Sequence, residues 1–545
     1  MLSVKINYNG EKYNYPKGVS LFEIAKDFQL NYKDEIIIAK VNGILTELNQ
    51  SIFNNSDVDF YDRNSIEGNR VYESGLLFVL IKAFKDEMDA NVFLEHSLDT
   101  GVYIKTDKVV NAEILKRITS RMNEIIKSNL TIEKLLINRK EAIKYYERHK
   151  ALDKVNLLKY NTNTNINLYK LDNIYDYFFN NLPISTGYLK EFKINLIDQH
   201  SFVLIYPNIY NNKANYKHHE KLFNEFEIYS LGVSKLGISS IYDLNQKVTE
   251  GKINDYILLS EANQTCRLVE IASKISSNKN IKIVLISGPS SSGKTTTSKK
   301  LQLFLKGFGL NPKTISIDDY YLDREKTPKK EDGTYDFETI KAIKIDEFNR
   351  DLSKLLKGEK VKIPTFNFVL GKGEYINPAE NLGENDILII EGLHALNDEL
   401  TSSIEKKYKF KIYVSPLSVL KLDNHNRIKT SDIRLLRRIV RDNKYRGYKA
   451  SDVLKSWESV REGEEQYVFP YQDEADVIFN TTLVYELGVL KTLATPLLYN
   501  VSEEDDNYKD AIRLLNLLKV ILPIPNDCIP KDSIIREFIG DGYFN

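Results

Sequence analysis

A glycine-rich segment between an apolar run and an amphipathic run constrains this chain more than any other feature. Residues 283–286 are apolar, and residues 288–295 (GPSSSGKT) follow almost directly. From Thr295 onward, TTTSKKLQLFLKGFG has the pattern of a helix. A strand, such a loop and a helix in this order form a phosphate-binding loop, because glycines let the backbone N–H groups wrap a phosphate closely. The segment therefore predicts an α/β domain that binds a nucleotide.

Each part of this loop has an expected contact. Lys294 is expected to neutralise the β- and γ-phosphate oxygens, and the Thr295 hydroxyl is expected to ligate Mg²⁺. The residues expected to bind ATP are Gly288, Ser290, Ser291, Ser292, Gly293, Lys294, Thr295 and Thr296. The loop alone does not separate a kinase from a GTPase or an ATPase motor. No Asn-Lys-x-Asp segment follows it, which argues against a guanine-specific GTPase.

Acidic residues end two apolar runs downstream of the loop. TISIDDYY contains Asp318 and Asp319, and DILIIEGLHAL contains Glu391. Ligands of an open α/β sheet bind at the carboxyl ends of its strands, so Asp318 and Glu391 are expected beside the loop. Asp319 is expected to point the other way, because side chains alternate along a strand.

A basic segment, IRLLRRIVRDNKYRGY, follows at residues 433–448. Its arginines are Arg434, Arg437, Arg438, Arg441 and Arg446. Helical spacing aligns Arg438 with Arg441, and Gly447 offers a mobile joint. A planar guanidinium matches phosphate oxygens, so the segment predicts a lid over the ATP phosphates. A solvated helix face or a nucleic-acid contact is the alternative.

Residues 280 to about 490 resemble the uridine kinase and phosphoribulokinase superfamily. The matching segments are GPSSSGKTT, SIDDYY, YDFE, IPTFNF, EGLHAL and RRIVRDNKYRG. The resemblance implies ATP and Mg²⁺ as cofactors and Asp318 as the general base. It further implies that Thr295, Asp318 and Glu391 hold the metal. Lys294, Arg441 and Arg446 would then stabilise the charge on the transferred phosphoryl group.

The same resemblance implies an acceptor site. Glu338 and Arg438 would face the ribose hydroxyls, with Tyr321 and Phe366 nearby. This sequence departs from uridine-cytidine kinases at several positions. Glu338 stands where those kinases have Asp, Phe366 and Gly371 stand where they have Tyr and His, and Tyr448 replaces an Arg of their lid. Phosphate chemistry is expected to be intact, whereas discrimination among bases is expected to be weak.

The N-terminal 62 residues predict a small strand-rich domain. Alternating apolar residues begin the chain, Ser20 and Glu23 predict a capped helix, and Asn42-Gly43 predicts a hairpin turn. YPKGVSLFEIAKDF and AKVNG resemble the TGS domain of threonyl-tRNA synthetases, certain GTPases and stringent-response proteins. RNA contact is what this resemblance implies, and a β-grasp module without RNA contact is the alternative.

Residues 63–225 resemble the editing domain of threonyl-tRNA synthetases in ANVFLEHSLDTGVYI, NRKEAIKYYE and ISTGYL. That domain uses a His-x-x-x-His pair and a Cys-x-x-x-His pair. Ser74 and Phe78 take the places of the first pair, and Phe178 and Leu182 those of the second. Phe and Leu neither ligate a metal nor move a proton, so the editing chemistry is expected to be absent. His96 is expected to be structural.

The expected fold class is a multidomain mixture of α+β and α/β. Residues 1–62 form a TGS-like β-grasp domain, 63–225 an α+β domain, 226–279 a helical linker, 280–495 a P-loop α/β kinase domain with a mainly parallel sheet, and 496–545 a helical extension. The extension is expected to pack, with a helix at AIRLLNLLKVIL stopped by Pro523.

Composition limits the class of protein. Lys plus Arg and Asp plus Glu are both 76, so net charge indicates neither nucleic acid nor an anionic membrane. Two cysteines exclude a disulfide framework. The first residues lack the pattern of a signal peptide, and no apolar run approaches about 20 residues. A cytoplasmic protein without a membrane partner is expected.

The expected activity is transfer of the γ-phosphoryl group of ATP to a hydroxyl of a small-molecule acceptor, foremost the 5′-hydroxyl of a nucleoside such as uridine. A kinase of a sugar or another metabolite is one alternative. An RNA-binding regulator that uses ATP as a switch, with RNA contact through the N-terminal domains, is another. An aminoacyl-tRNA synthetase is disfavoured because the kinase-like region occupies the place of the aminoacylation domain. The oligomeric state stays open.

Overall fold

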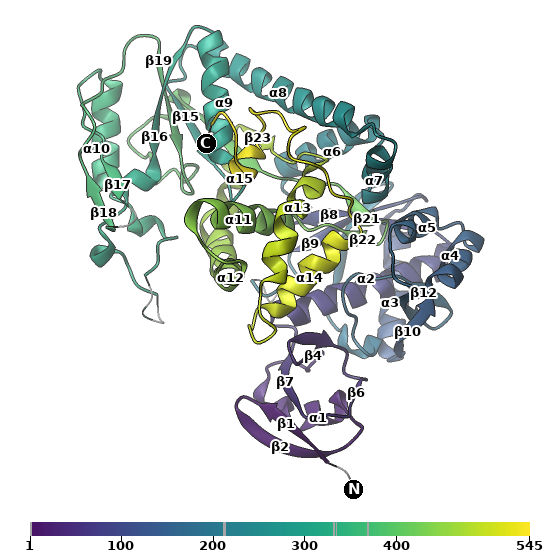
Figure 1. Cartoon of the computed structure of the whole chain (residues 1–545). Coiled ribbons are helices and arrows are strands. Elements are labelled where there is room, and N and C mark those ends of the chain that lie inside the picture. The colour runs from purple at the N-terminus through teal and green to yellow at the C-terminus, as the bar shows by residue number, and fades with distance from the viewer. Residues whose placement is uncertain (1–2, 211–213, 331–332, 334, 368–369, 545) are drawn as a thin grey trace.

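The structure is a computed structural model that describes residues 3–210, 214–330, 333, 335–367 and 370–544. It is a mixed multidomain fold, as expected. Figure 1 shows a small N-terminal sheet at one end, a middle region of helices and antiparallel sheets, and a larger region built on a parallel sheet. The yellow C-terminal helices lie among all three. No helix in the described ranges is long and apolar enough to cross a membrane.

The N-terminal sheet has the predicted β-grasp arrangement, with a helix packed on one face. The helix α1 (Leu21–Phe28) is capped by the Ser20 hydroxyl, which accepts from Glu23 N. Asn42 and Gly43 both have positive φ and connect β4 to β5, as predicted. The strand order is β2 (Glu11–Pro16), β1 (Ser3–Tyr8), β7 (Ser56–Tyr61), β4 (Ile38–Val41) and β5 (Ile44–Thr46); β3 (Val19–Ser20) pairs with β6 (Ser51–Ile52).

The middle region packs two antiparallel sheets around a buried helix, α2 (Ile66–Met88). One sheet has the order β13 (Lys193–Asp198), β14 (Ser201–Ile205), β9 (Gly101–Thr106) and β8 (Val92–Leu98); the other has the order β10 (Ile132–Asn138), β11 (Asn165–Leu171) and β12 (Ile174–Asp176). Its remaining helices are α3 (Ala112–Lys127), α4 (Arg139–Arg148) and α5 (Leu152–Lys159).

The four positions compared with an editing site come together in this region. Ser74 and Phe78 lie on α2, and Phe178 and Leu182 follow β12. The Phe78 and Phe178 rings are 5.0 Å apart, and Leu182 is buried in the same core. His96 is buried and stacked on Phe226 at 3.6 Å, which fits its expected structural role.

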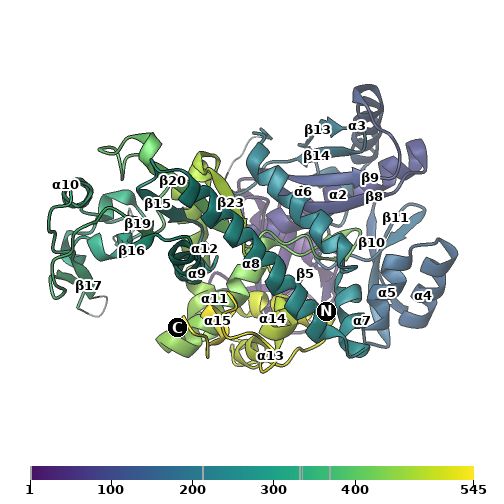
Figure 2. The same cartoon turned by 90° about the horizontal axis from the view of Figure 1, so that it is seen from above.

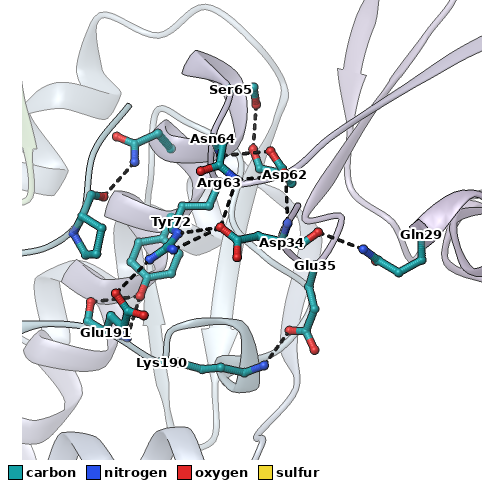
Figure 3. A network of polar contacts seen from close by, with 12 residues as sticks. Gln29, Asp34, Glu35, Asp62, Arg63, Asn64, Ser65, Tyr72, Lys190 and Glu191 are labelled. Atoms are coloured by element: carbon teal, nitrogen blue, oxygen red, sulfur yellow. Dashed lines mark hydrogen bonds and ion pairs between the residues drawn. The ribbon is translucent and has the colours of Figure 1, made fainter. Parts of the chain in front are cut away.

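Polar contacts join the N-terminal sheet region to residues 190 and 191 of the middle region, next to α2 (Figure 3). Arg63 contacts Asp34 at 3.0 Å and Glu191 at 3.3 Å, and Lys190 contacts Glu35 at 3.1 Å. The Tyr72 hydroxyl of α2 donates to the Glu191 carbonyl at 2.9 Å. The first sheet therefore meets the middle region through a network of charges rather than a chain connection alone.

Three helices lead to the parallel sheet: α6 (Glu220–Lys235), α7 (Ile241–Thr249) and α8 (Ile253–Ser277). Figure 2 shows α8 running across the molecule between the middle region and the sheet. All neighbouring strands of this sheet are parallel. The order is β16 (Asn311–Ser316), β19 (Asp386–Glu391), β15 (Ile283–Ser287), β20 (Lys409–Ser415) and β23 (Val477–Asn480).

Further helices and hairpins surround this sheet. They are α9 (Lys294–Gly307), α10 (Ile345–Leu356), β17 (Thr365–Asn367), β18 (Lys372–Glu374), β21 (Lys421–Asp423), β22 (Asn426–Arg427), α11 (Thr430–Arg446), α12 (Ala450–Tyr467), α13 (Glu486–Tyr499), α14 (Tyr508–Lys519) and α15 (Arg536–Ile539). The predicted helix before Pro523 is α14. The predicted boundaries at 225 and 495 fall inside α6 and α13, and the division into domains stays a prediction.

The hairpin β21–β22 joins the parallel-sheet region to the middle region. Arg427 and Lys429 contact Glu73 of α2 at 2.6 and 2.8 Å. Asp423 contacts Lys154 of α5 at 2.9 Å, with both side chains buried. Ser74 and the hairpin residues Asn426 and Arg427 line the same pocket, so the hairpin lies against the position compared with the editing site.

Candidate active site

The phosphate loop follows β15 at the carboxyl end of the parallel sheet, where the sequence predicts it. Gly288 is required by sterics, because a Cβ there would lie 1.9 Å from the Val414 carbonyl oxygen. Gly293 has φ of 90° and ends the loop at the start of α9. The Ser291 and Ser292 hydroxyls are buried and have no hydrogen-bond partner among the described residues. The loop therefore keeps polar groups that a phosphate could satisfy.

Lys294 lies folded over its own loop. Its Nζ donates to the carbonyls of Gly288 at 2.8 Å and Pro289 at 3.0 Å. Burial lowers the pKa of Lys294, and the nearby Glu391 and Asp318 oppose that shift. The ammonium thus lies in the loop beside two carboxylates, and a phosphate could replace its carbonyl partners.

Oxygen donors gather around this ammonium. The Thr295 hydroxyl donates to the Glu391 carboxylate at 3.3 Å. Burial raises the pKa of Glu391 to about 7, and it also raises the pKa of Asp318; Lys294 opposes both shifts. The described residues contain no group of three His, Cys, Asp or Glu side chains able to hold a metal. One hydroxyl and two carboxylates fit Mg²⁺, which usually takes one or two carboxylates together with phosphate and water oxygens.

Asp319 does not follow the expected strand alternation. The strand β16 ends at Ser316, and residues 317–320 form a 3-10 turn. In this turn the Asp319 carboxylate accepts a hydrogen bond from Phe366 N at 3.1 Å. Asp319 therefore points to the hairpin β17–β18. The sequence predicts a different direction from Asp318 because of strand alternation, but the 3-10 turn and the hydrogen bond from Phe366 N determine it instead.

The predicted acceptor residues lie together on the other side of Asp318. The centroids of the Tyr321 and Phe366 rings are 5.8 Å apart, and the ring planes are inclined at 63° to each other. Burial raises the pKa of Tyr321 well above its usual value, and the charges of Asp318 and Glu338 act in the same direction. Burial, with the neighbouring Glu464, raises the pKa of Glu338 to about 7, and Arg438 opposes it. Glu338 is therefore within electrostatic reach of Arg438, as expected.

Gly371 is a turn residue. Its φ is 67°, and a Cβ there would lie 2.9 Å from the Cβ of Arg324. A side chain at this position would be strained, so the absence of a polar group here is built into the hairpin.

The five arginines of the basic segment have two kinds of surroundings. Two are buried, and three contact Asp442. Arg434 and Arg437 point inward and are fully buried. Arg438 donates to the Ser290 hydroxyl at 2.9 Å and lies 3.3 Å from Asp442, and Arg441 also contacts Asp442, at 2.7 Å. Arg446 lies 3.5 Å from Asp442, at the end of α11 where Gly447 has φ of 69°. Arg438, Arg441 and Arg446 are thus gathered around Asp442, and Arg438 reaches the phosphate loop from there. Closure of a lid stays a prediction.

The region that carries this site is similar to known kinases. Residues 283–486 match the Phosphoribulokinase / Uridine kinase family. A uridine kinase from Halobacterium salinarum is 26% identical over 197 residues, which are 35% of this chain and 77% of that kinase. A solved structure of a putative fructose transport system kinase from Silicibacter is 18% identical with a TM-score of 0.29, over 39% of this chain and 98% of that one.

The N-terminal region matches a different kind of protein. A threonine–tRNA ligase from Carboxydothermus hydrogenoformans is 28% identical over 198 residues, which are 36% of this chain. These residues are 31% of the ligase, so the chain spans about a third of the length of the ligases that it matches. The chain therefore joins an N-terminal region similar to these ligases to a region, residues 283–486, that matches the Phosphoribulokinase / Uridine kinase family.

Sequence reasoning missed a brace of the phosphate loop, the buried ion pair of Arg434 and Glu464. Glu464 on α12 is fully buried and accepts from Ser290 N at 2.7 Å. Arg434 pairs with Glu464 at 2.5 Å and donates to the Ser290 carbonyl at 3.0 Å. Both backbone groups of Ser290 are therefore held by one buried ion pair. Arg461, three residues before Glu464, also contacts it at 3.2 Å, but the partners that connect Glu464 to the loop lie 30 and 174 residues away, so no local pattern marks this role.

A second missed contact comes from α15. The Glu537 carboxylate accepts a hydrogen bond from Thr296 N in the first turn of α9 at 3.0 Å. The sequence carries no signal for it, because Glu537 lies 241 residues beyond Thr296.

Proposed function

We propose that the protein is an ATP- and Mg²⁺-dependent kinase that phosphorylates a hydroxyl of a small molecule, foremost the 5′-hydroxyl of a nucleoside. One observation carries the proposal: Lys294, the Thr295–Glu391 pair and Asp318 meet at the carboxyl ends of adjacent parallel strands. The match of residues 283–486 to a kinase family supports the same reading.

Each side chain has a chemical role in this proposal. Bound Mg²⁺ would neutralise charge on the phosphate oxygens, and Thr295, Glu391 and Asp318 would hold it. Asp318 takes the proton of the acceptor hydroxyl, and its raised pKa makes it a stronger base than an ordinary Asp. Lys294, Arg441 and Arg446 stabilise the charge on the transferred phosphoryl group.

The acceptor side supports a ribose with a loosely recognised base. Glu338 and Arg438 are the polar pair available for vicinal hydroxyls. Phe366 offers an apolar ring, and Gly371 offers no side chain. An apolar pocket discriminates by only about 1–3 kcal/mol, so we expect weak selection among bases and poor turnover of deoxyribose acceptors. The same apolar lining favours the second candidate, a kinase of a sugar or another metabolite.

A screen of ATP consumption across ribonucleosides, deoxyribonucleosides, sugars and polyols tests the proposal, with products identified by mass spectrometry. Phosphorylation of several ribonucleosides is the expected result. Strict uridine selectivity would contradict the weak selection among bases. Turnover only with a non-nucleoside would replace the nucleoside by the second candidate. RNA-stimulated ATP hydrolysis without a phosphorylated acceptor would favour a regulator instead.

For the middle region we propose the loss of editing chemistry. The support is the apolar contact of Phe78 with Phe178 and the hairpin that lies against Ser74. Purified protein is expected to contain no stoichiometric zinc, measured by plasma emission spectroscopy, and not to hydrolyse mischarged tRNA. Zinc that disappears when residues 63–225 are altered would disprove this. Contact of the N-terminal regions with RNA is proposed only from their likeness to the ligases.

A further inference from the structure

The last part of the chain returns to the phosphate loop. After α14 the chain runs back toward α9 and forms the short helix α15, which lies beside α11 (Figures 1 and 2). Ile534 is fully buried against Gly293, where its Cγ2 lies 2.8 Å from the place of an added Cβ. The Phe538 ring lies 5.0 Å from the Arg437 guanidinium. The segment 533–539 is thus packed against Gly293 at the end of the loop and against Arg437 of α11.

The backbone of this segment is held rigidly. Arg536 is buried and donates to four carbonyls: those of Asn526, Ile529, Pro530 and Gly540. On the neighbouring helix α11, Lys444 donates to the Ile539 carbonyl at 2.9 Å. The position of residue 537 is therefore set by its neighbours, and only its side chain is free to change direction.

Glu537 takes a hydrogen bond that a phosphate would need. Helix α9 begins at Lys294, so Thr296 N is one of the first-turn N–H groups that have no partner within a helix. The next group, Thr297 N, already donates to the Gly293 carbonyl at 3.0 Å. In a phosphate loop, the free N–H groups at the start of the helix bind phosphate. The Glu537 carboxylate, like a phosphate, offers an anionic oxygen that accepts from this N–H group, and it fills this position.

We propose that Glu537 is an intramolecular competitor of the nucleotide phosphates and lowers the affinity of the site for ATP. The inference rests on the proposed function, because it assumes that ATP uses this loop. A phosphate cannot accept from Thr296 N while the carboxylate does so, and two anions at one N–H group repel each other. Nucleotide binding therefore requires the Glu537 side chain to leave. By linkage, whatever holds the carboxylate in place weakens nucleotide binding to the same degree.

Titration calorimetry with Mg²⁺-ADP and with a non-hydrolysable Mg²⁺-ATP analogue tests this on the full chain. The variants are Glu537→Gln, which removes the charge, and Glu537→Ala, which removes the contact. Asp527→Asn is the matched control, because Asp527 is an exposed carboxylate of the same C-terminal segment. Both Glu537 variants are expected to lower Kd by roughly 5- to 150-fold, the usual range of a coupling between two ligands, and the control is expected to leave Kd unchanged.

The outcomes separate this inference from the proposed function. An unchanged or increased Kd in the Glu537 variants, with nucleotide bound by the wild type, overturns the competitor and leaves the kinase proposal standing. The absence of nucleotide binding in every variant overturns the kinase proposal and the inference with it. Circular dichroism of each variant shows whether the fold is kept.

Discussion

At the scale of single residues, Asp318 and Asp319 have the same side chain and different surroundings. Asp318 lies beside Lys294, whereas Asp319 holds the hairpin β17–β18 through Phe366 N. We expect Asp318→Asn to bind ATP normally and to lower kcat by about 10²–10⁴-fold, the usual contribution of a positioned base. Asp319→Asn is the matched variant, and it should raise KM for the acceptor more than it lowers kcat. Steady-state kinetics measures both effects. A near-normal kcat in Asp318→Asn would mean that Asp318 is not the general base.

Glu338 predicts a pH dependence. Its pKa is raised to about 7 by burial, so below pH 7 the carboxyl is protonated and accepts fewer hydrogen bonds from an acceptor hydroxyl. At saturating Mg²⁺-ATP, kcat/KM for the acceptor should rise with pH through about 7. Glu338→Gln should lower kcat/KM and remove this rise. If Glu338→Gln keeps the same pH profile of kcat/KM, a group other than Glu338 causes the rise.

The same shift affects stability, with a definite sign. A raised pKa in the folded protein means that Glu338 contributes stability that is present below pH 4.5 and is lost as pH rises to about 7. Glu338→Gln lacks this titration. The difference in free energy of unfolding between the variant and the wild type (variant minus wild type) should therefore be larger at pH 8 than at pH 4.5. Urea unfolding at the two pH values measures this difference.

At the scale of elements, α11 and α12 hold the phosphate loop through the Arg434–Glu464 pair. Glu464→Ala leaves Arg434 buried without its carboxylate, and breaking a buried pair costs about 3–5 kcal/mol. We expect a loss of that size in the free energy of unfolding, together with a higher Kd for nucleotide. Glu465→Ala is the control, because its pair with Arg461 is more exposed and Arg461 keeps its second contact with Glu464 at 3.2 Å, so a smaller loss is expected. Equal losses of unfolding free energy in the two variants would contradict a special role of the Arg434–Glu464 pair in holding the loop.

Elements with local signals could be predicted from the sequence. Ser20 caps α1, Asn42-Gly43 turns β4 into β5, and the glycines of the loop require β15 and α9 on either side. Contacts between distant residues could not be predicted in this way. The spacing of the lid arginines shows a helix, but only the buried carboxylates on other helices determine which arginines point inward. The turn at Asp319 was missed because a strand pattern does not show where the strand ends.

At the scale of the whole molecule, Glu73 joins two regions. Burial opposes its charged form, yet Lys429 and Arg427 hold the pKa of Glu73 well below its usual value. Glu73→Ala leaves both cations without this partner, and we expect a loss of about 3–5 kcal/mol. Calorimetry should then show two melting transitions where the wild type shows one. Glu133→Ala, which removes an exposed pair with Lys170, should keep a single transition. A single transition in both variants would mean that other contacts join the regions.

The distance along the chain between Thr296 and Glu537 also has a consequence for synthesis. They are 241 residues apart, and a ribosome adds about 5–20 residues per second. Roughly 10–50 s therefore separate the translation of the loop from that of its competitor, by the same rates. During that interval a growing chain has no carboxylate on Thr296 N. On the proposed function, ATP that binds in that interval would stabilise the newly made region as a ligand, before Glu537 competes with it for Thr296 N.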